Sequence, residues 1–415
     1  MLYQSPGVYR EEIFLKPPVP LATGIPGFVG FAEFVGAIAP GQIPSTIEIK
    51  RREEFEQQFQ PAAKSYLGAA IAGFFENGGE RCYVSWAQVP PSQPLITTEA
   101  RIATIEAEAQ ALIAAVEALA TVEAVDLVAI PDVATLIPEV TSLQATDGPI
   151  NLAQVRTAAL AQAYAVQTFS IQHCNAQQDR FALLDALPQG SAKTVLEQRD
   201  AIATHQLLDR SVNAALYYPW LINDARRAVP PCGHVAGIIA RCDRTQGIFK
   251  APANKVVKDV QALQTPIVAA VQNQLNPMGV NCFRALPGRG IRLWGARTLS
   301  KNPAWRYINT RRLFLTVGRW IERNMAWATF ESNAPQLWVR IQRELTAYLT
   351  RLWRTGALQG NSADQAFFVK CDAETNPPEQ REIGQVVTEL GLAVTAPAEF
   401  LIVRITQRPD VTELA

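Results

Sequence analysis

The chain has 415 residues, of which 48% are hydrophobic and 18% are charged, a composition typical of a globular protein with a substantial core. Lys plus Arg and Asp plus Glu each total 38, so the chain as a whole is neither an acidic nor a basic polyelectrolyte. Six scattered cysteines are too few for a disulfide framework in a chain of this length, which favours a reducing compartment such as a cytosol. The length itself favours two or three domains.

Neither a secretion signal nor a membrane span is expected. The first residues lack a basic segment followed by an apolar stretch. Residues 24–41 contain a single charge, Glu33, but Pro26, Pro40 and several glycines fit buried strands with turns better than a spanning helix.

The first predicted element is an isolated strand at residues 8–15. A Pro-Gly pair at residues 6–7 precedes it, and the segment KPPVP at residues 16–20 separates it from the chain that follows. A single strand is not stable in water, so it must join the edge of a sheet, either its own or that of a neighbouring copy. The extended proline segment favours the neighbouring copy.

Short apolar strands alternate with helices through the next 200 residues. Helical stretches beginning near residues 98 and 152, and a third one before residue 213, each lead into an apolar run. The expected strands are residues 27–36, 81–86, 125–130, 180–188 and 213–221. This alternation predicts an α/β fold with a mostly parallel sheet that is covered on both faces.

Two amphipathic helices are expected at residues 311–330 and 335–354. Pro335 suits the first turn of the second helix, and Gly356 lies just past its end. At about 100° per residue its apolar side chains share one face, and four arginines fall on the opposite side within an arc of about 80°. These are Arg340, Arg343, Arg351 and Arg354.

The last predicted element is a half-buried strand close to the carboxy terminus. Leu401, Val403 and Ile405 alternate with Ile402, Arg404 and Thr406, and Pro409 stops the pattern. Like the strand at residues 8–15, it lies near a chain end and needs a sheet to join.

Charge is unevenly distributed along the chain. Residues 98–147 contain nine acids and one arginine, whereas residues 281–355 contain fourteen basic residues and three acids. A basic surface implies an acidic partner. Thirteen of the fourteen basic residues are arginines and no nucleic-acid reader motif is present, so a solvated helix face, an acidic protein partner and nucleic acid all remain open.

Catalytic and metal-binding patterns are weak. Cys232, His234 and Cys242, with the His173-Cys174 pair as a further contribution, are the best metal candidates. Only the Cys-x-His pair has tight spacing. We therefore expect buried thiols and a hydrogen-bonded histidine, and no metal site. Residues 77–80 and 287–290 are glycine-rich but lack the continuation of a phosphate loop, which predicts turns.

Several blocks of the chain resemble contractile tail sheath proteins, the sheaths of contractile phage tails, R-type pyocins and phage-like contractile injection systems. The blocks are SPGVYREE at residues 5–12, residues 230–255, 275–300 and 305–314, GALQG at 356–360, AFFVKCD at 366–372, and residues 391–407. They cover the amino terminus and most of the chain after residue 230.

The resemblance implies an organisation in four parts. These are an amino-terminal arm at residues 1–20, an α/β outer domain at 21–297 with a variable acidic region at about 92–221, an α+β tube-facing domain at 298–395, and a carboxy-terminal arm at 396–415. The arms exchange strands between subunits, which assigns Val8, Tyr9, Ile13, Leu401, Val403 and Ile405 to the links. The basic band of residues 281–355 becomes the tube-facing surface, with Arg340, Arg343, Arg351 and Arg354 as tube contacts.

The implied function is structural. Sheath subunits polymerise as stacked hexameric rings around an inner tube, from a baseplate to a terminator or cap, and contract to drive the tube through a target envelope. No enzyme activity, cofactor, nucleic acid or membrane insertion is expected. The particle is expected in the cytoplasm of the producing bacterium, or in a virion tail or released particle. An α/β enzyme with a Cys/His metal site and a nucleic-acid-binding filament are the alternatives.

Overall fold

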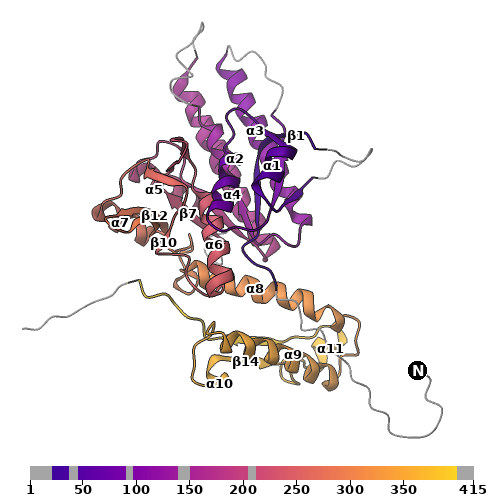
Figure 1. Ribbon diagram of the computed structural model, residues 1–415. Coiled ribbons are helices and arrows are strands. Elements are labelled where there is room, and N and C mark those ends of the chain that lie inside the picture. Colours follow the sequence, from indigo (N-terminus) through magenta and orange to yellow (C-terminus); the bar gives the residue numbers. More distant parts are fainter. Residues whose placement is uncertain (1–20, 37–44, 90–96, 139–149, 204–211, 400–415) are drawn as a thin grey trace, which may run out of the picture.

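The computed structural model describes residues 21–36, 45–89, 97–138, 150–203 and 212–399. The two predicted terminal strands therefore lie outside the described residues. Figure 1 shows a larger α/β part and a smaller C-terminal part, with helix α8 (Ile308–Met325) lying between them. In the described ranges, no helix combines the length and the apolar character needed to cross a membrane.

A ten-stranded sheet forms the centre of the larger part. Six parallel strands run through its middle in the order β4-β1-β5-β6-β7-β12, and antiparallel strands extend it. The parallel strands are β4 (Cys82–Ala87), β1 (Pro26–Phe34), β5 (Leu127–Ala129), β6 (Phe181–Asp185), β7 (Ala214–Tyr218) and β12 (Val280–Leu286). The antiparallel strands are β2 (Ile47–Ile49), β3 (Phe59–Pro61), β10 (Lys255–Val256) and β13 (Gly290–Leu293).

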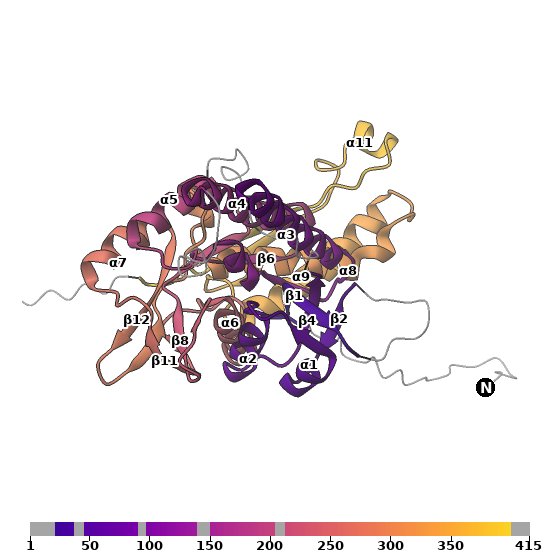
Figure 2. The same cartoon turned by 90° about the horizontal axis from the view of Figure 1, so that it is seen from above.

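Helices cover both faces of this sheet, as Figure 2 shows. Every residue of β6 and β7 is buried, which explains why these strands read as continuous apolar runs. One face carries α3 (Thr98–Ala118), α4 (Leu152–Gln177), α5 (Ala192–Ala203) and α7 (Ala269–Leu275). The other carries α1 (Arg52–Gln58), α2 (Leu67–Glu76) and α6 (Cys232–Gln246). The predicted α/β fold with a mostly parallel, covered sheet is confirmed.

Side-chain N-caps stabilise the first turns of α3 and α4, the two longest helices that cover the sheet. The Thr97 hydroxyl accepts a hydrogen bond from the Ala100 N–H at 3.1 Å, and the Asn151 amide oxygen accepts one from the Gln154 N–H at 3.1 Å. Each cap satisfies a backbone donor that has no partner within its helix.

Smaller elements complete the larger part. Residues 77–80 and 287–290 form turns, as predicted, and the second turn joins β12 to β13. A separate antiparallel sheet contains β8 (Leu221–Asn223), β9 (Ala228–Val229) and β11 (Val260–Leu263). Short 3-10 helices in the described residues include η1 (Leu119–Thr121), η2 (Pro131–Leu136), η5 (Asn276–Met278), η6 (Pro303–Trp305) and η7 (Ala326–Ala328).

The C-terminal part is built on α8 and α9 (Pro335–Arg354). The Trp320 ring of α8 stacks on the Tyr348 ring of α9 with 3.8 Å between centroids, which joins the two helices. A two-stranded antiparallel sheet packs beside them. The remaining elements are α10 (Ala363–Ala366), β14 (Phe367–Lys370), α11 (Pro378–Glu382) and β15 (Glu389–Leu392).

Both predicted amphipathic helices are present. α9 begins at Pro335 as expected, and Trp338, Ile341 and Leu345 are buried on its apolar face. α8 begins three residues before the expected residue 311 and ends at Met325, where η7 follows. The larger part and the C-terminal part thus meet along α8.

Candidate functional site

The sequence-derived metal candidates do not converge. Cys232, His234 and Cys242 all lie on α6, where the spacing of the first two points their side chains to different sides of the helix. No group of three His, Cys, Asp or Glu side chains that could hold a metal is found among the described residues. The described part of the chain therefore offers no site for the metal-dependent alternative.

The surroundings of these residues are those of a packed core. The Cys232 N–H donates to Asp185 Oδ1 at 2.8 Å, and burial raises the pKa of the Cys232 thiol well above its usual range. The His234 ring lies against Gly73, and burial lowers the pKa of His234 to about 4. Both side chains are almost completely buried, so they belong to the packed core and do not line a solvent-accessible site.

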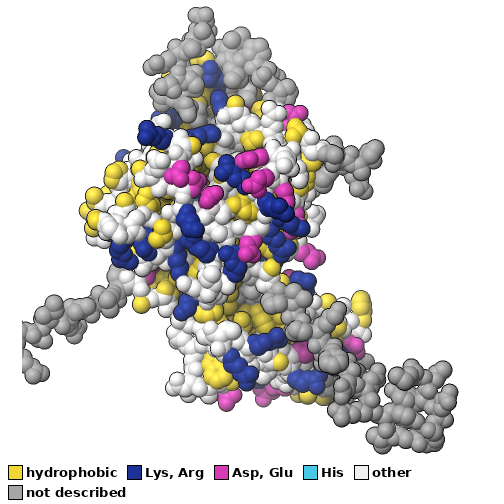
Figure 3. All heavy atoms as spheres, viewed as in Figure 1, with side chains coloured by type: hydrophobic (Ala, Val, Ile, Leu, Met, Phe, Trp, Pro, Cys, Tyr) yellow, Lys and Arg dark blue, Asp and Glu magenta, His cyan; other side chains and the backbone are white. Residues whose placement is uncertain are grey.

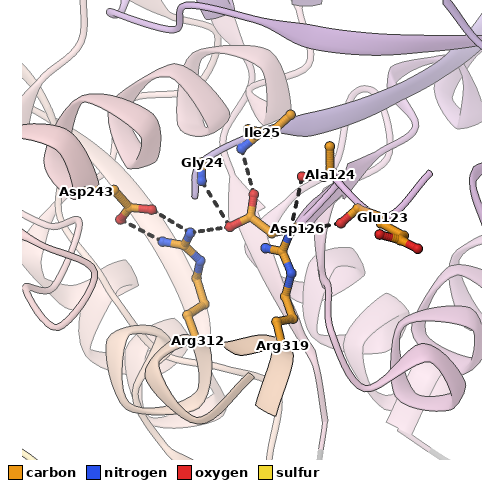
Figure 4. Close-up of polar contacts among 8 residues, drawn as sticks. All are labelled: Gly24, Ile25, Glu123, Ala124, Asp126, Asp243, Arg312 and Arg319. Atoms are coloured by element: carbon orange, nitrogen blue, oxygen red, sulfur yellow. Dashed lines mark hydrogen bonds and ion pairs between the residues drawn. The ribbon is translucent and has the colours of Figure 1, made fainter. Parts of the chain in front are cut away.

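A buried ion-pair cluster joins α8 to the larger part (Figure 4). Arg312 donates to Asp126 Oδ2 at 2.9 Å and to both carboxylate oxygens of Asp243 at 2.9 and 2.7 Å. The Arg312 side chain is 3% exposed. Burial alone lowers the pKa of Arg312, but the two carboxylates outweigh this effect and raise it.

The same cluster holds the chain at the point where the described residues begin. One cation faces two carboxylates, so the excess negative charge needs further donors in a buried setting. The N–H groups of Gly24 and Ile25 donate to Asp126 at 2.9 and 2.6 Å and supply them. Residues 21–25, called the N-arm root below, are therefore attached to Arg312 through Asp126.

Two further arginines of α8 contact the amino-terminal ends of the parallel strands. Arg319 donates to the carbonyls of Glu123 and Ala124, just before β5, at 2.9 and 3.3 Å (Figure 4). Arg311 donates to Asn213 Oδ1, just before β7, at 2.5 Å. Arg311, Arg312 and Arg319 are together called the α8 seam. They attach the C-terminal part to the larger part at the amino-terminal ends of the parallel strands β5 and β7.

The expectation that the whole basic band of residues 281–355 forms one outer surface is wrong. Arg297, Arg312 and Arg319 are each at least nine-tenths buried. They supply charged donors to buried carboxylates and carbonyls inside the chain, so they are unavailable to an external partner.

The end of the described chain is held in a similar way. Arg297 forms a bidentate ion pair with Glu399, in which Nε lies 2.9 Å from Oε1 and Nη2 contacts Oε2. Asn309, in the first turn of α8, donates to the Thr395 carbonyl at 3.2 Å. Residues 395–399 are called the C-arm root below.

The four arginines of α9 lie on its exposed face. Arg340, Arg343, Arg351 and Arg354 are all exposed, on the side of α9 opposite its buried residues. Arg340 also lies over the Trp327 ring at 3.5 Å and pairs with Glu344 at 3.5 Å. Figure 3 shows Lys and Arg as well as Asp and Glu side chains on the surface of the C-terminal part. The four arginines, called the α9 stripe below, place four positive charges on the exposed face of α9.

The small sheet has two outer edges that no described strand covers, although the Val369 carbonyl of β14 accepts a hydrogen bond from Gln342 Nε2 at 3.4 Å. Within the described ranges β14 pairs only with β15, over four residue pairs, so each strand has one edge without a neighbouring strand. Two-stranded sheets are marginal in water, and a strand edge presents free N–H and C=O groups. The predicted arm residues Val8, Tyr9, Ile13, Leu401, Val403 and Ile405 lie outside the described residues.

Comparison with known proteins assigns the family. The model of the phage tail sheath protein central domain matches residues 152–299, and that of the phage tail sheath C-terminal domain matches residues 300–408. A tail sheath protein of Vibrio phage KVP40 is 27% identical over 191 residues, which are 45% of this chain and 27% of the phage protein. The chain belongs to the contractile tail sheath family.

Two solved structures match nearly the whole chain. The sheath of an extracellular contractile injection system, PVC, in the contracted state has a TM-score of 0.68 and 25% identity, over 98% of this chain and 99% of that one. The contracted helical sheath of the anti-feeding prophage has a TM-score of 0.64 and 26% identity, over 98% and 100%. The chain spans roughly a quarter to half the length of the curated relatives that it matches.

Proposed function

We propose that this protein is the repeating subunit of a contractile sheath that polymerises helically around an inner tube and contracts to drive the tube through a target envelope. The observation that carries the proposal is the match of 98% of the chain to sheath subunits in contracted assemblies. The arm roots and the open edges of the β14–β15 sheet support it from the chain's own contacts.

The arms link the subunits. The strands around Val8, Tyr9 and Ile13, and around Leu401, Val403 and Ile405, add to the free edges of the β14–β15 sheet of neighbouring copies. Main-chain hydrogen bonds then supply the affinity and alternate side chains supply the register. Donation from one copy to the next is heterologous and, unless it closes into a ring, builds a helical filament.

The α9 stripe faces an acidic surface of the inner tube. Exposed ion pairs of Arg340, Arg343, Arg351 and Arg354 contribute about 0–1 kcal/mol each. Many weak contacts hold the sheath in register along the tube and release it when the lattice rearranges. The four-part division at residues 20, 297 and 395 belongs to the same proposal, with the acidic region around residues 98–147 facing outward.

The protein acts without catalysis, because the energy of contraction comes from better contacts between subunits in the contracted lattice. Its partners are other copies in stacked hexameric rings, the inner tube, the baseplate and a terminator or cap protein, and neither nucleic acid nor membrane. Assembly takes place in the cytoplasm of the producing bacterium, and the particle is a phage tail or a released phage-like particle.

Electron microscopy of the purified full-length protein beside a variant lacking residues 1–16 tests the proposal. We expect the full-length chain to form hollow, striated tubes, alone or on co-expressed inner tube and baseplate, and the truncated chain to remain a folded monomer. Identical tubes from both chains would contradict the strand exchange, and the lack of tubes with every partner present would contradict the sheath itself.

A further inference from the structure

The C-arm root has two attachments, and both lead to α8. Arg297 is 9% exposed and its Nη1 also donates to the Asn276 carbonyl at 3.1 Å, so the pair with Glu399 is fixed at the arginine end. Arg297 itself forms a β-bridge with Tyr307, the residue just before α8. Glu399 is therefore connected to the start of α8 through one side chain and one backbone bridge.

The second attachment lies in α8 itself. Asn309 is 3% exposed, and besides the Thr395 carbonyl it holds the Phe249 carbonyl at 2.9 Å. Its amide is thus fixed between the larger part of the molecule and the C-arm root.

The N-arm root is attached one turn further along the same helix. Arg312 follows Asn309 by three residues, a spacing that places two side chains on neighbouring positions of one helix face. Arg312 holds Asp126, and Asp126 holds the N–H groups of Gly24 and Ile25. The two arm roots, at opposite ends of the described chain, are therefore held by two residues three positions apart in the first turns of α8.

These attachments decide where a pull on the carboxy-terminal arm is resisted. Without them, the pull would pass along residues 395–398 to Val394, which forms a single β-bridge with Leu358, and from there to β15. β15 is held to β14 by four residue pairs. A two-stranded sheet is a weak support. With them, the pull reaches Arg297 and Asn309 first, and the small sheet stays available to receive neighbouring strands.

We propose that the first turns of α8 are a tension junction: a pull on either arm passes through Glu399–Arg297 and Asn309–Thr395, along α8, and through Arg312–Asp126 to the other arm. This inference rests on the proposed function, in which the arms connect the subunits. The β14–β15 sheet carries little of this load, and the outer α/β part follows α8 as an attached body.

Pulling single full-length chains by handles on residues 1 and 415 in an optical trap tests the junction. The test variant is Glu399→Gln, which keeps the shape and removes the charge. We expect its first opening at a lower force than wild type, because charge-assisted hydrogen bonds are about twice as strong as neutral ones. The opening should release at most residues 389–399, which gives an upper limit of roughly 40 Å for the extension at about 3.5 Å per residue.

Glu344→Gln is the control, with the same change of side chain. Glu344 pairs with Arg340 at 3.5 Å and accepts a hydrogen bond from Trp327 Nε1 at 3.1 Å, beyond the last turn of α8 and at the opposite end of this helix from the arm roots. Its first opening should occur at the wild-type force. A wild-type opening force for Glu399→Gln, or an equal loss in both variants, would overturn the junction. Pulling uses single chains, so its result does not depend on whether tubes form. Tube formation tests the proposed function, and the pulling experiment tests the junction.

Discussion

The two long helices of the C-terminal part make opposite use of arginine. α8 and α9 stack on each other through Trp320 and Tyr348, and both are rich in arginine. Arg312 and Arg319 of α8 are buried among carboxylates and carbonyls, whereas the α9 stripe is exposed. The number of charges on a helix therefore says less about a binding surface than the face on which they lie.

The difference follows from helical position. Ile308, Arg312, Leu315 and Arg319 recur at spacings of three and four, so the two α8 arginines lie within the apolar stripe, next to side chains that belong to the core. In α9 the arginines lie opposite the apolar stripe. An arginine inside an apolar stripe must find charged or carbonyl partners within the protein.

The largest effect that separates the helices is expected for Arg312→Ala. It leaves Asp126 and Asp243 buried without their cation, which costs about 3–5 kcal/mol of unfolding free energy. Urea unfolding of the monomer measures the loss. Arg351→Ala on the α9 stripe is the control and should stay within about 0.5 kcal/mol of wild type. Equal effects of the two variants would remove the distinction.

Asp185 is a buried acid whose protonation should make the stability of the protein depend on pH. Asp185 accepts from the Cys232 N–H, no ion pair to it occurs among the described residues, and burial raises the pKa of Asp185 to about 7. Its folded pKa lies above the unfolded value, so its folded form keeps a proton between about pH 4 and 7 and its contribution to stability is lost as pH rises through that window.

Asp185→Asn removes this loss. The unfolding free energy of the variant minus that of wild type should increase by up to about 4 kcal/mol as the pH is raised from 4 to 8. Urea unfolding at several pH values measures the gain. A difference between variant and wild type that is constant with pH would show that Asp185 ionises normally in the folded protein.

Arg319→Ala tests the contacts that the α8 seam makes with uncharged backbone carbonyls. The carbonyls of Glu123 and Ala124 lose their donor, which costs about 1–3 kcal/mol where they stay buried. The loss should be smaller than that of Arg312→Ala, because no charge is left unpaired. Thermal or urea unfolding measures both losses of unfolding free energy. A larger loss for Arg319→Ala than for Arg312→Ala would contradict this prediction.

The smallest effects on stability are expected on the α9 stripe. Arg343→Glu and Arg351→Glu should leave the unfolding free energy within about 0.5 kcal/mol of wild type. Their combination should abolish co-sedimentation with the inner tube, and the wild-type interaction should weaken with added salt, because exposed charges are screened. Unchanged, salt-independent co-sedimentation would place the tube contact elsewhere.

Much of the fold is predictable from local pattern. The continuous apolar runs of β6 and β7 and the helices between the strands indicate a covered parallel sheet, and Pro335 marks the start of α9. The position of the α9 stripe follows from its 3.6-residue period. Each of these features depends on neighbours within about twenty residues.

The buried charge contacts could not be predicted in this way. Asp126 and Arg312 are 186 residues apart, and Arg297 and Glu399 are 102 apart. Nothing in the local sequence pairs them, so a count of basic residues assigned Arg297, Arg312 and Arg319 to an outer surface. The placement of Arg312 and Arg319 within the apolar stripe of α8 was the available signal of their burial.

A helical reconstruction of the assembled tubes by electron cryomicroscopy, at a resolution that traces the arms, would show where the arms bind and which way the α9 stripe faces. We expect the strands around Val8 and Leu401 of neighbouring copies on the two outer edges of the β14–β15 sheet, with the α9 stripe facing the tube axis. Arms that fold back onto their own chain, or an α9 stripe on the outside of the tube, would contradict it.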